Sequence, residues 1–167
     1  YGSWQASKLV FCEGYQAINN PWLKELPFKL AKGEIVTVKT EQPNKHMLSW
    51  ANWLVPSKRD PNTAKLGASY AWNDLDLRPD PAVSDKLLES LAQHTGQTAT
   101  VLSHQVGIRP TTVQRQPFVG ALSNLPNAYC FNGFGSKGCL TIPYYAALLC
   151  EHFQHGVELP KEIHQWL

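Results

Sequence analysis

The chain carries, at residues 132–141, the stretch NGFGSKGCLT, in which three glycines fall within six residues. A short strand is expected just before it at residues 127–131, and a helix just after it at residues 143–155, which Gly156 would end. Glycine allows a positive φ and lets a ligand approach the backbone closely. Successive backbone N–H groups at the start of a helix favour an anion or an electron-rich oxygen. The stretch therefore predicts a ligand-contacting turn between a strand and a helix.

The spacing of Gly133, Gly135 and Gly138 is formally the G-x-G-x-x-G fingerprint of dinucleotide-binding proteins. A true fingerprint opens a βαβ unit and is followed, about 20 residues later, by an acidic residue at the end of the next strand. The chain ends soon after the expected helix and shows no second strand. A plain tight turn into a helix therefore stays an alternative for this stretch taken alone.

A second motif, GIRPTT at residues 107–112, stands at the end of an apolar strand. Pro110 holds the backbone of Arg109 extended. A rigidly placed guanidinium can donate two parallel hydrogen bonds to a carboxylate. Arg109 is therefore a candidate ligand for a substrate carboxylate, with a structural ion pair or a surface arginine as the alternatives. A third motif, FCEGY at residues 11–15, by itself indicates only a strand that ends in a turn.

The rest of the pattern indicates an α+β fold, an antiparallel sheet flanked by a few helices. The connections between the first strands are too short for parallel crossovers. An amphipathic helix is expected to begin near Ser84 and to end near Gly96, with leucines at helical spacing. The 167 residues are treated as a single domain. Further strands are expected at residues 8–12, 28–40, 46–55, 64–71 and 98–105.

Composition narrows the class of protein. Hydrophobic residues make up 43% of the chain and charged residues 17%, which is typical of a globular protein. A net charge of +2 gives no electrostatic footprint for nucleic acid, and no apolar run approaches the roughly 20 residues of a membrane helix. The cysteines form no C-x-x-C pair, so we expect no metal site. Each stands among apolar or small neighbours, so we expect buried, reduced thiols and a cytoplasmic location. The four cysteines are Cys12, Cys130, Cys139 and Cys150.

In this order, the motifs resemble the family of FAD-dependent oxidoreductases that includes D-amino-acid oxidase, glycine oxidase and sarcosine oxidase. Its members end an apolar strand in an Ala-Thr-Gly-like turn, as at residues 11–14, and continue with a Pro-x-x-x-x-x-Gly-Glu/Gln strand, as at residues 27–34. A Gly-Leu-Arg-Pro-like element and a Pro-x-Ile/Val-Gly step follow, as at residues 107–120, and a glycine-rich turn enters the last helix, as at residues 132–149. The resemblance covers nearly the whole chain and implies a carboxy-terminal substrate domain that lacks its Rossmann half.

The resemblance also implies roles for single residues. Arg109 would hold the substrate carboxylate, and Lys137 would be a second carboxylate ligand whose charge also stabilises the anionic reduced flavin. Tyr70 and Trp72 could line the pocket by their strand position, with a core or surface aromatic as the alternative for each. The implied contacts of the FAD cofactor are Gly14, Phe134, Gly135, Ser136, Lys137, Gly138, Cys139 and Leu140.

The implied reaction is hydride transfer from the α-carbon of a small amino or imino acid to flavin, after which water hydrolyses the imine. Such a site needs no general-base motif, because the cofactor supplies the difficult step. The family begins with a βαβ unit that grips the ADP half of FAD, and nothing upstream of Tyr1 supplies one. We therefore expect the isolated chain to fold but to be inactive, with an apolar face that can support a homodimer.

Two other functions stay open at this point. The chain could be a non-enzymatic module that uses Arg109 to bind a carboxylate ligand, or a structural subunit of a multichain oxidoreductase. The first predicts amino-acid binding by the chain alone, and the second predicts a separate chain with the dinucleotide fingerprint. The sequence indicates neither the side chain of the substrate nor whether oxygen or a quinone accepts the electrons.

Overall fold

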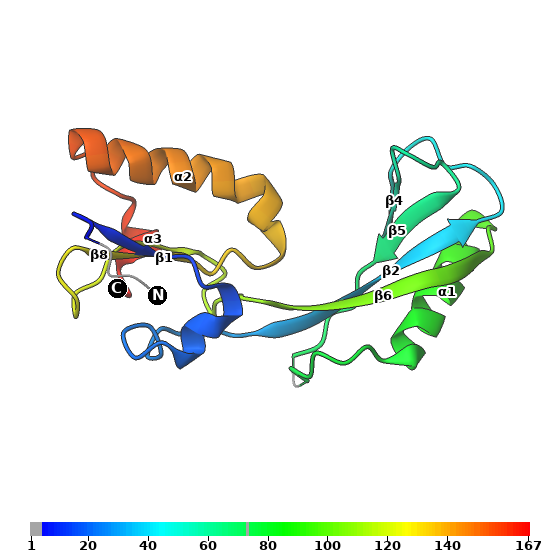
Figure 1. The fold of residues 1–167 in the computed structure, drawn as a ribbon, viewed down its shortest axis with the longest axis horizontal. Coiled ribbons are helices and arrows are strands. Elements are labelled where there is room, and N and C mark those ends of the chain that lie inside the picture. Colours follow the sequence, from blue (N-terminus) through cyan, green and yellow to red (C-terminus); the bar gives the residue numbers. More distant parts are fainter. Residues whose placement is uncertain (1–4, 73) are drawn as a thin grey trace. The chain divides into compact units, whose positions relative to one another are not determined.

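A computed structural model describes residues 5–72 and 74–167 of the chain (Figure 1). The residues group into two compact units. Unit 1 contains the described residues up to Leu30 together with Arg109–Leu167, and unit 2 contains Ala31–Ile108. Each unit has its own sheet and its own core. The treatment of residues 1–167 as one domain stays a prediction.

Unit 1 is built on a three-stranded sheet in the order β1-β8-β7. Strand β1 (Leu9–Phe11) runs parallel to β8 (Ala128–Asn132), and β7 (Phe118–Ala121) runs antiparallel to β8. Because the first two strands are parallel, their carboxyl ends lie at the same edge of the sheet. The strand β7 has no counterpart among the expected strands, and the remaining two confirm the strands expected at residues 8–12 and 127–131.

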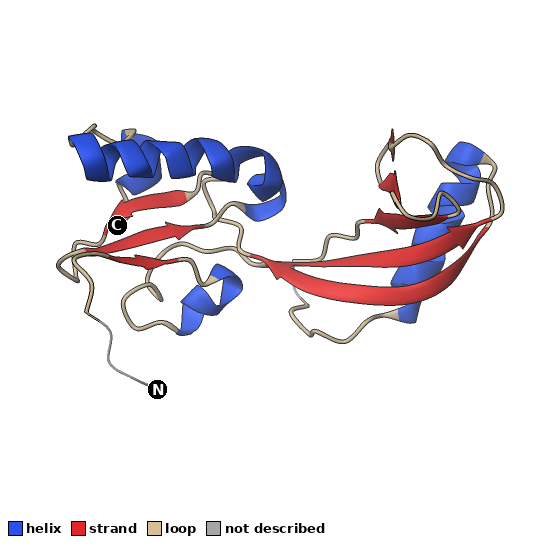
Figure 2. Cartoon of the chain, turned by 45° about the horizontal axis from the view of Figure 1, so that its top comes forward, coloured by secondary structure: helices blue, strands red, loops and turns tan. Residues whose placement is uncertain are grey.

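Both faces of this sheet are covered (Figure 2). Side chains of β8 alternate between the faces, so that Ala128 and Cys130 join a core with the 3₁₀ helix η1 (Gly14–Asn19), whereas Tyr129 and Phe131 face the helical side. That second core contains apolar residues of the long helix α2 and of the short helix α3. The two helices are α2 (Gly138–His155) and α3 (Lys161–His164).

Unit 2 is a five-stranded antiparallel sheet in the order β3-β4-β5-β2-β6, with one helix packed on it (Figure 2). Alternate residues of β2, such as Val36 and Val38, are fully buried against leucines of the helix. These findings confirm the expected α+β fold with its antiparallel sheet. The strands are β2 (Ala31–Thr40), β3 (Leu48–Ser49), β4 (Trp53–Pro56), β5 (Thr63–Gly67) and β6 (Ala99–Arg109).

The helix of unit 2, α1 (Pro81–Thr95), begins one turn earlier than expected. Asp80 caps it by accepting a 2.9 Å hydrogen bond from the backbone N–H of Ala82, and Pro81 fits the first helical position because a missing N–H costs nothing there. Asp80 and Pro81 therefore start the helix three residues before Ser84. Gly96 ends the helix in a left-handed conformation, as expected.

Three other expectations are wrong in detail. The strand expected at residues 46–55 is two short strands with a bend between them. Helix α2 begins at Gly138, so that Pro143 lies inside the helix and not in its first turn. Only Cys130 is buried, because the other three cysteines lie at a strand end and on the outer side of α2. Across residues 5–72 and 74–167, no helix is long and apolar enough to cross a membrane.

Candidate functional site

The glycine-rich turn begins where β8 ends, beside the end of β1. Asn132, the last residue of β8, is only 3% exposed and donates a 2.8 Å hydrogen bond from its Nδ2 to the carbonyl oxygen of Gly14. Its Oδ1 accepts a 2.8 Å hydrogen bond from the backbone N–H of Gly133. One buried amide therefore joins two of the sequence motifs at the carboxyl edge of a parallel strand pair, which is where α/β sheets commonly bind ligands.

The GIRPTT motif packs directly against the same turn. The backbone N–H of Gly135 donates a 3.2 Å hydrogen bond to the carbonyl oxygen of Pro110. A Cβ added at Gly133 would lie 2.6 Å from the methyl group of Thr112, and one added at Gly135 would lie 2.9 Å from that of Thr111. Both glycines also have a positive φ, of 82° and 55°. Glycine is therefore required at both positions by backbone conformation and by packing on the two threonines.

The two candidate carboxylate ligands come from segments that this packing brings together. Arg109 is the last residue of β6 and is half-buried, one residue before the carbonyl group that Gly135 contacts. Lys137 is exposed and occupies the N-cap position of α2. Both lie in unit 1. Their functional roles stay predictions.

Lys137 adds its positive charge to that of the N-terminus of α2. The aligned peptide dipoles of a helix leave about half a positive charge at its N-terminus. In the part of the chain that the structure describes, no side chain hydrogen bond caps this N-terminus. A lysine there costs the helix roughly 0.3–1 kcal/mol by like-charge repulsion. An anion or an electron-rich ligand atom would remove that repulsion, because it is attracted both by the ammonium group and by the helix terminus.

Most residues of the turn that the resemblance assigns to the flavin are exposed or half-buried. The side chain of Leu140 is 80% exposed, and a Cβ added at Gly14 would meet no atom within 4 Å. Phe134 differs, because its ring lies 4.7 Å from the ring of Phe131 and 5.9 Å from that of Tyr145, measured between centroids, and it packs on the core. The remaining candidate contacts Ser136, Lys137 and Cys139 are exposed, and Gly135 and Gly138 are half-buried.

The aromatic residues Tyr70 and Trp72 lie in unit 2, after the end of β5. Their rings meet edge to face with centroids 4.9 Å apart, and the two residues are 47% and 43% exposed. A role in a ligand pocket stays a prediction for both. The structure shows what holds the segment that carries them.

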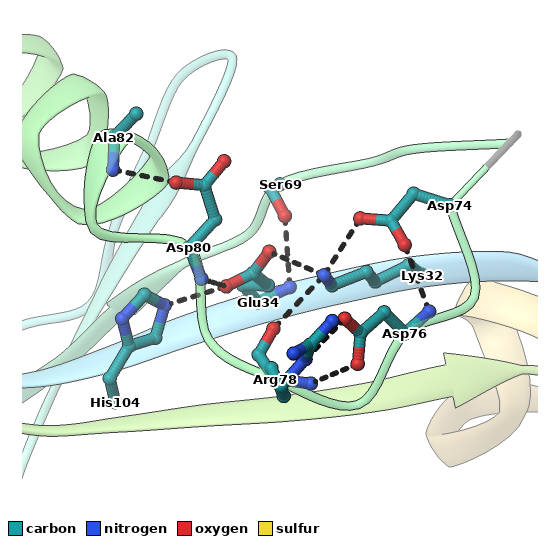
Figure 3. A network of polar contacts seen from close by, with 9 residues as sticks. All are labelled: Lys32, Glu34, Ser69, Asp74, Asp76, Arg78, Asp80, Ala82 and His104. Carbon is teal, nitrogen blue, oxygen red and sulfur yellow. Dashed lines mark hydrogen bonds and ion pairs between the residues drawn. The ribbon is translucent and has the colours of Figure 1, made fainter.

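That segment, of which residues 68–72 and 74–80 are described, is attached to β2 by a network of charged groups in which Lys32 and Glu34 are buried and the Asp74 side chain is 55% exposed (Figure 3). Lys32 is 2% exposed, and its Nζ lies 2.9 Å from Asp74 Oδ2, 3.1 Å from the carbonyl oxygen of Arg78 and 3.5 Å from Glu34 Oε1. The hydrogen bond with Asp74 raises the pKa of Lys32 and lowers the pKa of Asp74. Both groups are therefore held in their charged forms.

Glu34 is the second anchor of the network. It is 2% exposed, and its Oε2 accepts a 3.0 Å hydrogen bond from the backbone N–H of Asp80 and lies 2.9 Å from His104 Nε2. Its backbone N–H donates a 2.9 Å hydrogen bond to Ser69 Oγ. The sequence motif that ends in Gly33-Glu34 indicates the position of Glu34 in the chain. The partners of Glu34 are up to 70 residues away and belong to no sequence motif of their own.

The fold of the chain is similar to that of part of several solved oxidases. Glycine oxidase from Geobacillus kaustophilus superposes with a TM-score of 0.74 at 22% identity, over 90% of this chain and 42% of that one. Iminodiacetate oxidase from Chelativorans sp. BNC1 superposes with a TM-score of 0.75 at 20% identity, over 98% of this chain and 46% of that one. The fold is thus that of part of a flavin-dependent oxidase.

Sequence comparison identifies the family. The model of the FAD-dependent oxidoreductases (DAO) matches residues 2–152, and the chain belongs to this family. It is also similar to the tRNA 5-methylaminomethyl-2-thiouridine biosynthesis bifunctional protein MnmC of Idiomarina loihiensis, at 28% identity over 89% of the chain, and to that of Legionella pneumophila, at 26% over 83%. The chain spans about a quarter of the length of these curated relatives, 27% and 25%.

Proposed function

We propose that the chain provides the substrate-binding and flavin-ring-contacting part of an enzyme that oxidises an amino or imino acid. The observation that carries this proposal is the contact of the GIRPTT motif with the glycine-rich turn through the Gly135–Pro110 hydrogen bond. It places a candidate carboxylate ligand, Arg109, beside a turn whose outer surface is exposed. The family membership of the chain supports FAD as the cofactor.

In this proposal each group of the site has a separate task. Bound FAD would supply the hydride acceptor. Arg109 would fix the substrate by donating two hydrogen bonds to its carboxylate, which orients the α-carbon toward the flavin-contacting residues. Lys137 and the N-terminus of α2 would stabilise negative charge that develops next to the turn. The exposed residues Cys139 and Leu140 would cover one side of the ring and keep water away from it.

The part of the family fold that binds the ADP half of FAD is not found among the described residues, which contain no βαβ unit with a dinucleotide fingerprint. We therefore propose that the isolated chain is inactive, and that activity belongs to the protein in which it is joined by such a part. Two of the solved relatives are named as oxidases of small substrates of this kind, glycine and iminodiacetate.

The test is to express the chain from its full coding sequence, together with any chain that copurifies, and to record the visible absorption spectrum. The proposal predicts a yellow protein whose flavin absorbance is bleached anaerobically by a glycine-type amino or imino acid. A protein that never carries flavin in any such preparation would overturn it. Calorimetric binding of amino acids to the 167-residue chain alone would support the carboxylate-binding module instead, because the oxidase site is incomplete without flavin.

A further inference from the structure

The two edges of the five-stranded sheet in unit 2 differ in length. At one edge lies β3, a strand of only two residues. At the other edge lies β6, a strand of eleven residues, which among the described strands pairs only with β2 (Figure 1). Ile108 alone of these eleven residues is buried. One side of a long strand therefore offers backbone N–H and C=O groups that no other described strand of this sheet uses.

The sequence of β6 carries none of the charges that usually keep two sheet edges apart. Natural proteins protect an edge strand by making it short, or by placing prolines or charged side chains on it, lysine above all. Residues 96–108 contain no Lys, Arg, Asp, Glu or Pro, and Arg109 stands only at the end of the strand. Leu102, in the middle of the strand, is apolar and 55% exposed. This edge is therefore open to pairing with another strand.

The side chains of β6 do not alternate strictly between the two faces of the sheet. Ala99 and Val101 pack on the core that α1 covers. His104 lies on this covered face too, because its Nε2 is 2.9 Å from Oε2 of Glu34, which is buried two residues before Val36 of the same core. Strict alternation would place odd-numbered and even-numbered residues on opposite faces. The pattern of the strand therefore changes once, between residues 101 and 104.

This change of face is the pattern of a β-bulge, one extra residue in the strand. Leu102 and Ser103 are both exposed, as two successive residues on the uncovered face of the sheet would be. Gln105 lies on that uncovered face as well, because it accepts a hydrogen bond from Lys65 of β5, whose two chain neighbours are buried in the core. Counted from the midpoint between Leu102 and Ser103, covered and uncovered side chains follow one another in the same order in both directions.

We propose that β6 pairs with β6 of a second copy of this chain, antiparallel and about a twofold axis between Leu102 and Ser103. Directly opposite side chains of two paired strands lie on the same face, so a strand that pairs along β6 must change face where β6 does. A second copy meets this condition by symmetry, because its own bulge falls at the axis. A strand from a different polypeptide would need the same irregularity at the same point.

The pairing also brings no like charges together. Ala99 lies opposite Val106 of the second copy, and Val101 lies opposite its His104, both on the face that the α1 helices cover. Arg109 lies beyond the paired residues 99–106, where like charges directly opposite each other would be destabilising. Because the contact consists of little more than two strands, it is small beside obligate interfaces, and we expect a reversible dimer with a Kd of roughly 1–100 μM.

The test is sedimentation velocity of the chain from about 1 to 300 μM, with hydrogen exchange at both ends of this range. The chain should pass from monomer to dimer, and the amides of residues 99–106 should exchange several-fold more slowly at the higher concentration. Leu102→Lys should stay monomeric, because it places two ammonium groups side by side at the axis. Met47→Lys is the matched control, because Met47 is 61% exposed and precedes β3 at the opposite edge, and it should dimerise like the unchanged chain.

Charge complementation tests the axis itself. Leu102→Glu should also be monomeric, but an equimolar mixture of Leu102→Glu and Leu102→Lys should dimerise, because opposite charges then meet at the axis, and this rescue excludes misfolding as the cause of the loss. A chain that stays monomeric over the whole range, a dimer that Leu102→Lys leaves intact, or a mixture that does not associate would overturn the inference. So would a loss of the dimer in Met47→Lys alone, which would place the interface at the β3 edge. None of these measurements involves flavin, so the inference can fail while the proposed function stands.

Discussion

Replacing Asn132 with alanine should destabilise unit 1 more than any exposed asparagine does. The change removes two hydrogen bonds of 2.8 Å, one to the Gly14 carbonyl oxygen and one from the Gly133 N–H. Gly133 is buried and Gly14 is half-buried, so water can replace the lost partner only in part. An unsatisfied buried group costs about 1–3 kcal/mol, which gives about 2–6 kcal/mol for the pair.

The assay is urea denaturation followed by circular dichroism. With a slope of about 2 kcal/mol per M urea, the midpoint for unit 1 should fall by roughly 1–3 M. Hydrogen exchange locates the effect, because the amides of β1 and of the glycine-rich turn should exchange faster in the Asn132→Ala variant. Amides of unit 2 should be unchanged.

Asn124→Ala is the matched control. Asn124 is exposed and makes one 3.1 Å hydrogen bond, to the carbonyl oxygen of Trp22, so its loss should cost no more than about 0.5–1 kcal/mol. If Asn132→Ala shifts the midpoint no more than this control, the two motifs are not held together by the Asn132 amide and the reasoning is refuted.

Three further predictions concern charge and thiol chemistry. Lys137→Asn should stabilise α2 by about 0.3–1 kcal/mol in thermal melts, because it removes a cation from the helix N-terminus, and should slow flavin reduction in the complete enzyme. The ion pair with Lys32 lowers the pKa of Asp74 below its ordinary value of 3.8. The pair therefore stabilises the folded protein fully above pH 3.8, and this stabilisation is lost as the pH falls through the lowered pKa. A Lys32→Met variant should show a smaller loss of stability over that pH range. Burial raises the pKa of the Cys130 thiol to about 12, so a thiol reagent at pH 8 should label Cys139 in the native protein and Cys130 only after unfolding.

The local patterns of the chain predict its elements well where one residue type controls the conformation. Gly96 and Gly156 end their helices in the left-handed conformation, as the sequence indicates. The alternation of β-branched residues in β2 likewise identifies a strand with one buried face. In contrast, the predicted start of α2 is wrong. Pro143 favoured the first turn of a helix, but the helix begins at Gly138.

Contacts between distant segments were beyond prediction from local pattern. Nothing in the sequence around Thr111 and Thr112 shows that their methyl groups pack on Gly135 and Gly133. The anchoring of residues 68–80 by Lys32 likewise depends on partners more than 40 residues away. Such contacts depend on the register of strands and on the fold, which a single sequence does not specify residue by residue.

The central claim is that Arg109 binds a substrate carboxylate beside the flavin-contacting turn. The most direct measurement is anaerobic flavin reduction in the complete enzyme by matched pairs, glycine against methylamine and sarcosine against dimethylamine. The account predicts a strong preference for the carboxylate-bearing member, and Arg109→Met should lower kcat/KM for that member by about a hundredfold while leaving the amine nearly unchanged. An equal loss for both members of each pair would contradict it, since Arg109 would then act on the fold and not on the carboxylate.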